Sequence, residues 1–128
     1  MGTRLHAVTL VVPDYEAAID FYVAALGFEL VANEDLGGGK RWVLVRPPGG
    51  GAALLLAKAS DAAQRAIIGG QTGGRVGFFL EADDFHAEHV RLLDAGVVFE
   101  ETPRRESYGW VAVWRDPFGN RWDLIEFS

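Results

Sequence analysis

The chain has 128 residues, of which 49% are hydrophobic, and a formal net charge of −6. This length predicts one domain, 1–128, with a core of its own. The 12 basic residues are scattered, so we expect neither a nucleic-acid partner nor an anionic membrane surface. The chain has no cysteine, which excludes disulfides, thiolate metal ligands and a cysteine nucleophile, and favours a cytoplasmic location.

The first half of the chain predicts the element order β-α-β-β-β. The apolar run before Pro13 is too short for a signal peptide or a membrane span and indicates a buried strand. Asp14 is a suitable cap for a helix that continues to Leu26 and stops at Gly27. The expected strands are 8–12, 28–32, 41–46 and 52–57, with turns at 33–40 and 47–51.

The second half predicts the same order after a linker at 58–74, which contains a possible short helix at 60–68. Asp84 is expected to cap a helix that closes at Gly96. Strands are expected at 75–82 and 97–101, and a polar loop at 102–107. The final stretch, 108–127, predicts a hairpin around the turn Asp116-Pro117-Phe118-Gly119-Asn120, where Asp, Pro and Gly stand at type I turn positions.

The two halves match in register, since Asp14 and Gly27 stand where Asp84 and Gly96 stand. The sequence therefore predicts an α+β fold of two tandem modules, 1–57 and 75–128. Each module would cover one face of a curved mixed sheet with a helix on the outside, and the free faces would surround a shared cavity.

HAVTLVVPDYEAAIDFYVAALGFEL at the front and WRDPFGNRWDLIEF at the back resemble the vicinal oxygen chelate superfamily. This group includes glyoxalase I, bleomycin- and fosfomycin-resistance proteins and extradiol dioxygenases. The resemblance implies the duplicated fold, a homodimer, and four strand positions that hold a metal in the family's enzymes. With the repeat as a ruler, those positions are Ala7, Leu54, Gly77 and Asp123. Only Asp123 is a possible ligand, so no cofactor is expected, although a divalent metal held by Asp123 and other ligands stays an alternative.

The histidines leave alternatives open. His6 is next to a family position, but a shift of one residue turns its side chain to the other strand face. His86 and His89, one helical turn apart, suit either zinc or helix packing. Asp123 is interpreted as a ligand anchor, a general base, or a structural acid paired with Arg121 or Arg41.

The aromatic residues are the feature of the sequence that favours a ligand-binding pocket. Tyr108, Trp110 and Trp114 share strand parity and are expected to form an aromatic wall, unless they pack a core. The remaining candidates for ligand contact are Trp42, Phe79, Glu81 and Arg105, with Arg104 as a second cation for an anionic group.

Three hypotheses follow. The first is metal-independent binding of a small aromatic or antibiotic-like molecule in an aromatic-lined cavity. The second is a metal-dependent lyase, isomerase or dioxygenase that uses Asp123. The third is a vestigial cavity with a role in self-association.

Overall fold

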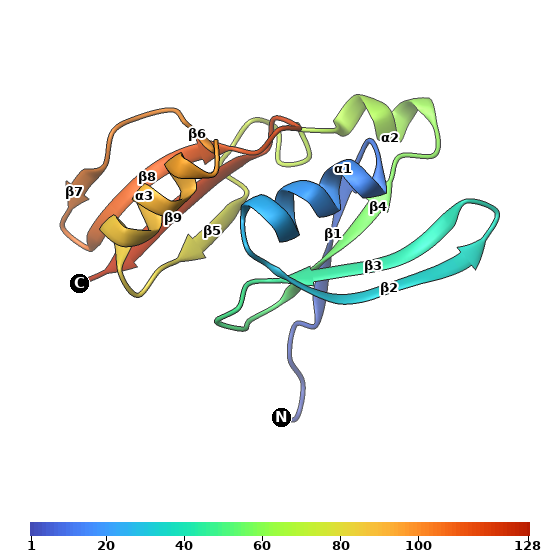
Figure 1. The fold of residues 1–128 in the computed structure, drawn as a ribbon, viewed down its shortest axis with the longest axis horizontal. Coiled ribbons are helices and arrows are strands. Elements are labelled where there is room, and N and C mark those ends of the chain that lie inside the picture. The colour runs from blue at the N-terminus through green and yellow to red at the C-terminus, as the bar shows by residue number, and fades with distance from the viewer. The chain divides into compact units, whose positions relative to one another are not determined.

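The computed structural model describes all residues from 1 to 128, and they form two compact units, Met1–Ile68 and Gly69–Ser128 (Figure 1). The division lies inside the segment 58–74 that the sequence marks as a linker. Part of that segment is helical, because Asp61 caps the short helix α2 (Ala62–Ile67) by accepting a hydrogen bond from the backbone N of Gln64 at 2.8 Å.

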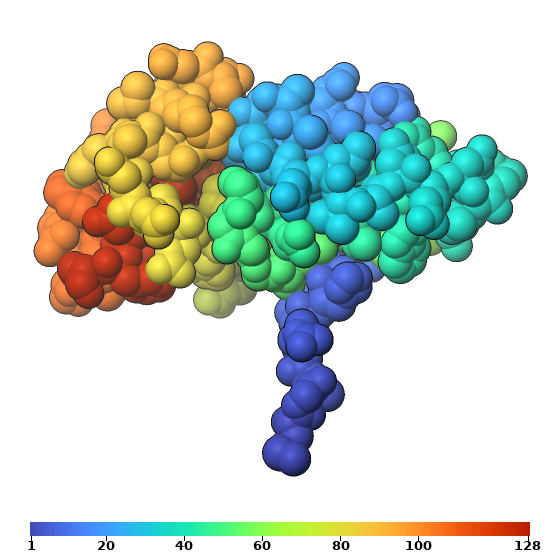
Figure 2. Space-filling model, turned by 60° about the horizontal axis from the view of Figure 1, so that its bottom comes forward, coloured from blue at the N-terminus to red at the C-terminus, as the bar shows by residue number.

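The first unit contains a four-stranded mixed sheet. Its strands are β1 (Ala7–Val12), β2 (Glu29–Gly37), β3 (Lys40–Arg46) and β4 (Ala53–Lys58). Their order across the sheet is β1-β4-β3-β2, and only β1 and β4 run parallel. The residues before β1 are exposed, and Figure 2 shows them in dark blue as an arm that stands out from this unit.

The first helix begins as predicted, because the Asp14 carboxylate accepts a hydrogen bond from Ala17 N at 3.0 Å. It is not one regular helix. An α-helical turn, α1 (Tyr15–Ile19), continues as a π-helix, η1 (Asp20–Ala25). There Leu26 N donates to Phe21 O at 2.8 Å, a bond that spans five residues.

The turn predicted at 33–40 is wrong. β2 continues to Gly37, which pairs with Lys40, so the turn itself is only Gly38 and Gly39. Their φ angles of 64° and 80° are left-handed, as the twist of a two-residue hairpin requires. Polar residues such as Glu34 are tolerated in β2 because the strand is exposed to water along nearly its whole length.

The second unit contains the strands β5 (Phe78–Glu81), β6 (Val98–Phe99), β7 (Arg104–Glu106), β8 (Gly109–Arg115) and β9 (Arg121–Phe127). The sheet order is β5-β9-β8-β6, with β7 paired to β8 and with β5 and β9 parallel. The loop expected at 102–107 is therefore wrong in part, since β7 is a strand that closes a tight hairpin with β8.

Helix α3 (Phe85–Asp94) lies across one face of this sheet (Figure 1). The Asp84 carboxylate caps it by accepting from Ala87 N at 3.2 Å, as the sequence predicts. The backbone N of Phe85 also donates to the Glu126 carboxylate of β9 at 2.7 Å, which fixes the start of the helix on the sheet.

The turn between β8 and β9 is confirmed and is held by a buried acid. Gly119 N donates to the backbone O of Asp116 at 3.1 Å, which closes the turn. The Asp116 carboxylate accepts from Phe118 N at 3.0 Å and Asn120 N at 2.9 Å. It also accepts from the Asn120 amide at 2.8 Å and from Trp122 Nε1 at 3.3 Å. Asp116 is therefore a structural residue.

These elements confirm the predicted α+β class, with two mixed sheets that do not close into barrels. No helix is long and apolar enough to cross a membrane.

Candidate functional site

The two faces of the second sheet differ in chemistry. Strand alternation places Phe78, Trp114 and Trp122 on the face that α3 covers. Trp122 stacks between the other two rings, with centroid distances of 4.7 Å to Phe78 and 4.9 Å to Trp114. Trp114 is completely buried, so this aromatic layer is core.

The predicted aromatic wall is therefore wrong as a lining for Asp123. Trp114 pairs directly with Trp122, and Asp123, the next residue of β9, points to the opposite face. Trp110 also lies on the α3 side, with its ring 4.7 Å from His86. Arg105 lies on the same side, since its guanidinium carbon is 5.8 Å from the centroid of the Trp110 ring.

Asp123 lies on the other side of the sheet, which we call the helix-free face. Its direct neighbours there are Phe79 on β5 and Val113 on β8. The acid is 7% exposed, and its Oδ1 atom accepts no hydrogen bond. Phe79 beside it is 65% exposed, so Asp123 lies just inside the boundary between core and solvent.

Burial raises the pKa of Asp123 because the ionised carboxylate loses hydration; the Arg104 charge opposes this and Glu101 adds to it. Arg104 forms its hydrogen bonds with acids other than Asp123. Its Nε atom donates to Glu101 at 2.9 Å and its Nη1 atom to Glu106, and these bonds raise the pKa of Arg104. The second Glu101 oxygen accepts from Val113 N at 2.8 Å. The group Glu101, Arg104 and Glu106 is called the β7 ion cluster below.

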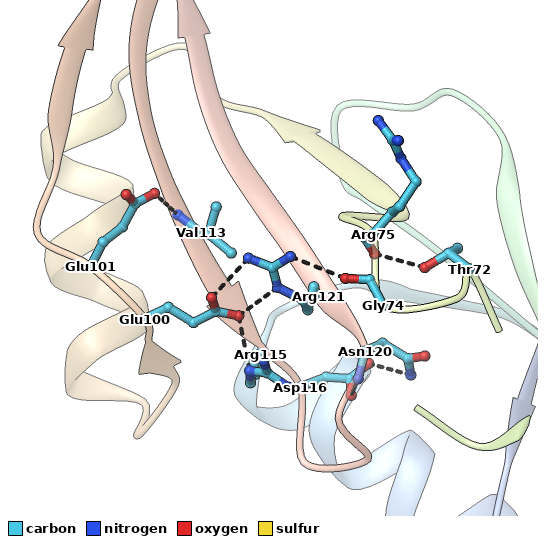
Figure 3. A network of polar contacts seen from close by, with 10 residues as sticks. All are labelled: Thr72, Gly74, Arg75, Glu100, Glu101, Val113, Arg115, Asp116, Asn120 and Arg121. Atoms are coloured by element: carbon cyan, nitrogen blue, oxygen red, sulfur yellow. Dashed lines mark hydrogen bonds and ion pairs between the residues drawn. The ribbon is translucent and has the colours of Figure 1, made fainter. Parts of the chain in front are cut away.

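The next row of the helix-free face holds a second ion cluster (Figure 3). Arg121 binds Glu100 through Nε at 2.8 Å and Nη2 at 2.9 Å, and Arg115 adds a contact at 2.9 Å. These bonds lower the pKa of Glu100, with the Arg121 hydrogen bond as the largest cause. The remaining Arg121 nitrogen donates to Gly74 O at 3.1 Å. The alternative in which Asp123 pairs with Arg121 is therefore wrong, since Arg121 binds Glu100 and Gly74.

Arg41, the other alternative partner of Asp123, has its own partners within the first unit. Its guanidinium pairs with Glu16 and donates to Asn33 Oδ1 at 3.1 and 2.8 Å. Arg41 and Asn33 border a hollow of about 440 Å³ at the tip of the β2–β3 hairpin, and the other residues that line it are Asp35, Gly37, Gly38 and Gly39. No buried polar atom faces this hollow without a partner, so it is a weaker candidate than the surroundings of Asp123.

The strand registers correct one of the four family positions. Asp123 pairs with Phe79, and the residue that pairs in the same way in the first unit is Leu55, opposite Thr9. Leu54 instead pairs with Val45, which points to the buried side of that sheet. The offset between the two halves, taken from the repeat, is therefore wrong by one residue at this position.

The residues present do not fit a metal. Ala7 and Leu55 carry no donor atom, and a side chain at Gly77 would meet the Thr72 methyl group at 2.4 Å. No group of three His, Cys, Asp or Glu side chains is placed to hold an ion. Of the family positions, only Asp123 offers an oxygen ligand.

His86 and His89 agree with the packing alternative. The His89 ring lies 4.6 Å from Phe99 and 6.0 Å from Phe85. Burial, followed by the nearby His86, lowers the pKa of His89. His6 is exposed just before β1.

The other predicted contact residues are spread over the molecule. Glu81 is exposed at the end of β5, on the same face as Asp123. Tyr108 is exposed in the turn between β7 and β8. Trp42, on β3 of the first unit, is 38% exposed. Sequence reasoning missed Glu101 as part of the site, although its spacing of three residues from Arg104 is a usable signal for an ion pair.

Comparison with known proteins gives the family. The model of the glyoxalase/bleomycin resistance protein/dioxygenase superfamily matches residues 4–124. The chain belongs to this superfamily. The recognition made from the sequence motifs is thus confirmed.

Several members of the glyoxalase/bleomycin resistance superfamily are similar over nearly the whole chain. An uncharacterized protein from Shewanella frigidimarina is 46% identical over 94% of this chain and 91% of its own. The crystal structure of UcmS2 has a TM-score of 0.83 and 30% identity, covering 98% of each chain. TnmS3, described as an antibiotic binding protein from Streptomyces sp. CB03234, has a TM-score of 0.79 and 31% identity, covering 100% of this chain and 99% of its own.

Proposed function

We propose that this protein binds a small aromatic or antibiotic-like molecule without a metal, and that Asp123 is the polar anchor. The observation that carries the proposal is the Oδ1 atom of Asp123, which is buried and accepts no hydrogen bond. Leaving a buried polar atom unpaired costs about 1–3 kcal/mol, so such an atom in a native fold calls for an explanation. A ligand N–H or O–H group at this position supplies the missing bond.

The surroundings of Asp123 support an apolar ligand body. Val111, Val113 and Ile125 are buried aliphatic neighbours on the same face, and Phe79, which is exposed, offers the ring on which a ligand can stack. The lining is therefore mainly aliphatic with one aromatic group, in place of the tryptophan wall expected from the sequence. Similarity to TnmS3, an antibiotic binding protein, adds support for binding over catalysis.

Binding is tested by ¹⁵N–¹H NMR titration of the full chain with a panel of planar aromatic compounds. We expect shifts in the amides of Val113, Asp123 and their neighbours on β5, β8 and β9. The panel should include rings with and without an N–H or O–H donor. No shift with any compound contradicts the proposal, as does binding that maps only to the first unit.

Metal independence is tested by elemental analysis of protein purified without a chelator. We expect well below one equivalent of zinc, nickel, iron or manganese. A near-stoichiometric amount of any of these would revive the enzyme hypothesis, with Asp123 as one ligand. The same titration repeated in the presence of a chelator is expected to give the same affinities.

We also propose that the protein forms a homodimer and acts in the cytoplasm. Support for self-association comes from the exposed edge strand β2, on which Leu30, Val31 and Leu36 are 41%, 41% and 52% exposed. Sedimentation equilibrium gives the molecular mass directly. A monomer at all concentrations would contradict the dimer.

A further inference from the structure

The cations nearest Asp123 are already bound to other acids. On one side Arg104 donates to both Glu101 and Glu106, and on the other Arg121 gives two bonds to Glu100 and one to Gly74. Asp123 is thus a buried carboxylate without a counter-ion of its own, although two arginines are close to it in the fold.

The charges around Asp123 do not cancel. The charged residues on or beside the helix-free face are Glu81 on β5, Glu100 and Glu101 after β6, Arg104 and Glu106 on β7, Arg115 on β8 and Arg121 on β9, and of these Arg104 and Glu101 act on Asp123 most directly. Counted with Asp123, five acids meet three bases, a net charge of −2. Arg104 and Glu101 act on Asp123 in opposite directions, so it is the buried carboxylate itself, without a hydrogen-bond donor of its own, that favours a cation.

We propose that Asp123 binds the protonated amine of an amphipathic cation whose apolar body stacks on the exposed ring of Phe79. This inference rests on the proposed function and names the chemical class of the ligand. The ammonium group supplies both things that Asp123 lacks, namely a donor for Oδ1 and a positive charge. An anionic ligand is disfavoured, since no arginine on this face is free of an acidic partner.

Ligand binding is then linked to protonation. The pKa of Asp123 is raised above 3.8 by burial, so at acidic pH the acid is neutral and attracts an ammonium group only weakly. Affinity for the amine therefore rises as pH increases through the pKa of Asp123, and it is constant above that point while the amine stays protonated.

The test uses three probes with one ring system: 1-naphthylmethylamine as the cation, 1-naphthylmethanol as the neutral donor and 1-naphthoate as the anion. Each is titrated into the full-length protein at pH 7 and followed by ¹⁵N–¹H NMR. We expect the amine to bind about tenfold more tightly than the alcohol, and the anion most weakly, because a charged hydrogen bond replaces a neutral one. Asp123→Asn should remove the preference for the amine over the alcohol, because the charge that distinguishes the two probes is gone.

Asp94→Asn is the matched control, because Asp94 is an exposed acid at the end of α3 and its change alters the net charge equally. It should not affect any probe. Equal affinities for the three probes overturn the cationic class but leave the proposed function intact. An amine preference that survives in Asp123→Asn overturns the role of Asp123. The absence of binding by all three overturns this inference and the proposed function together.

Discussion

The two sheets share one architecture but differ at the same structural position. In the first unit Leu55 stands opposite Thr9, whereas in the second Asp123 stands opposite Phe79. The cores differ as well: both contain buried rings, Tyr22 and Phe28 in the first unit among them, but only the second has three rings stacked in a row. The two units thus share a strand order, whereas only the second has a buried acid and stacked tryptophans.

The largest effect is expected in the aromatic core. Trp114→Ala should lower the free energy of unfolding by about 3–5 kcal/mol, because a completely buried indole stacked on Trp122 is replaced by a cavity. Trp42→Ala is the control in the first unit, and it should cost about 1 kcal/mol or less since Trp42 is 38% exposed. Urea unfolding measures both. Equal losses would show that the two tryptophans do not differ in role.

The second largest effect is expected at the turn between β8 and β9. Asp116→Ala should cost about 2–3 kcal/mol, because four donors lose a buried acceptor. Asp35→Ala is the comparison in the first unit, where the carboxylate accepts only from Gly37 N in an exposed hairpin, and about 0.5 kcal/mol is expected. Thermal unfolding followed by circular dichroism distinguishes the two values.

Without a ligand, the buried Asp123 carboxylate should lower the free energy of unfolding of the protein. Asp123→Asn is expected to raise the free energy of unfolding by about 1 kcal/mol at pH 7, because it removes a buried charge. The folded-state pKa is above 3.8, so the wild-type acid favours folding below that pH, and this contribution is lost as pH rises through the folded pKa. The stability advantage of the Asp123→Asn variant over the wild-type protein should therefore disappear at about pH 3. A pH-independent difference between the two proteins would contradict the buried, desolvated carboxylate.

The smallest effect concerns the second ion cluster. Glu100→Gln should cost about 0.5–1 kcal/mol at pH 7, and less in 1 M salt, because two arginines lose a shared charged partner. The pKa of Glu100 lies below 4.5, so this stability is present above pH 4.5 and is lost as pH falls through the folded pKa. Glu29→Gln, which breaks the single exposed pair with Arg46, should have no measurable effect. A loss of equal size at both positions would argue against the cluster.

The strands and caps were predictable because their signals are local. Asp14, Asp84 and the Asp116 turn are recognised from a few neighbouring residues, and the family follows from the same motifs. Register was less predictable. Whether Trp114 and Asp123 share a face depends on the pairing between β8 and β9, and the structure places them on opposite faces. The two halves also differ in length by single residues, so the offset between them selected Leu54 where the strand register gives Leu55.

Charge partners were also beyond the sequence. Arg121 lies two residues before Asp123 on the same strand. Its guanidinium binds Glu100, which is distant in sequence, and not Asp123. Such a choice depends on the distances between side chains across strands. Sequence spacing within one strand contains no information about it.

The π-helical turn η1 lies where the two helices differ in length. From its capping aspartate to its closing glycine, the first helix has one residue more than the second. A bond spanning five residues, as from Leu26 to Phe21, takes up such an insertion without moving the residues that follow. The π-helical turn thus accommodates the one residue by which the first helix exceeds the second.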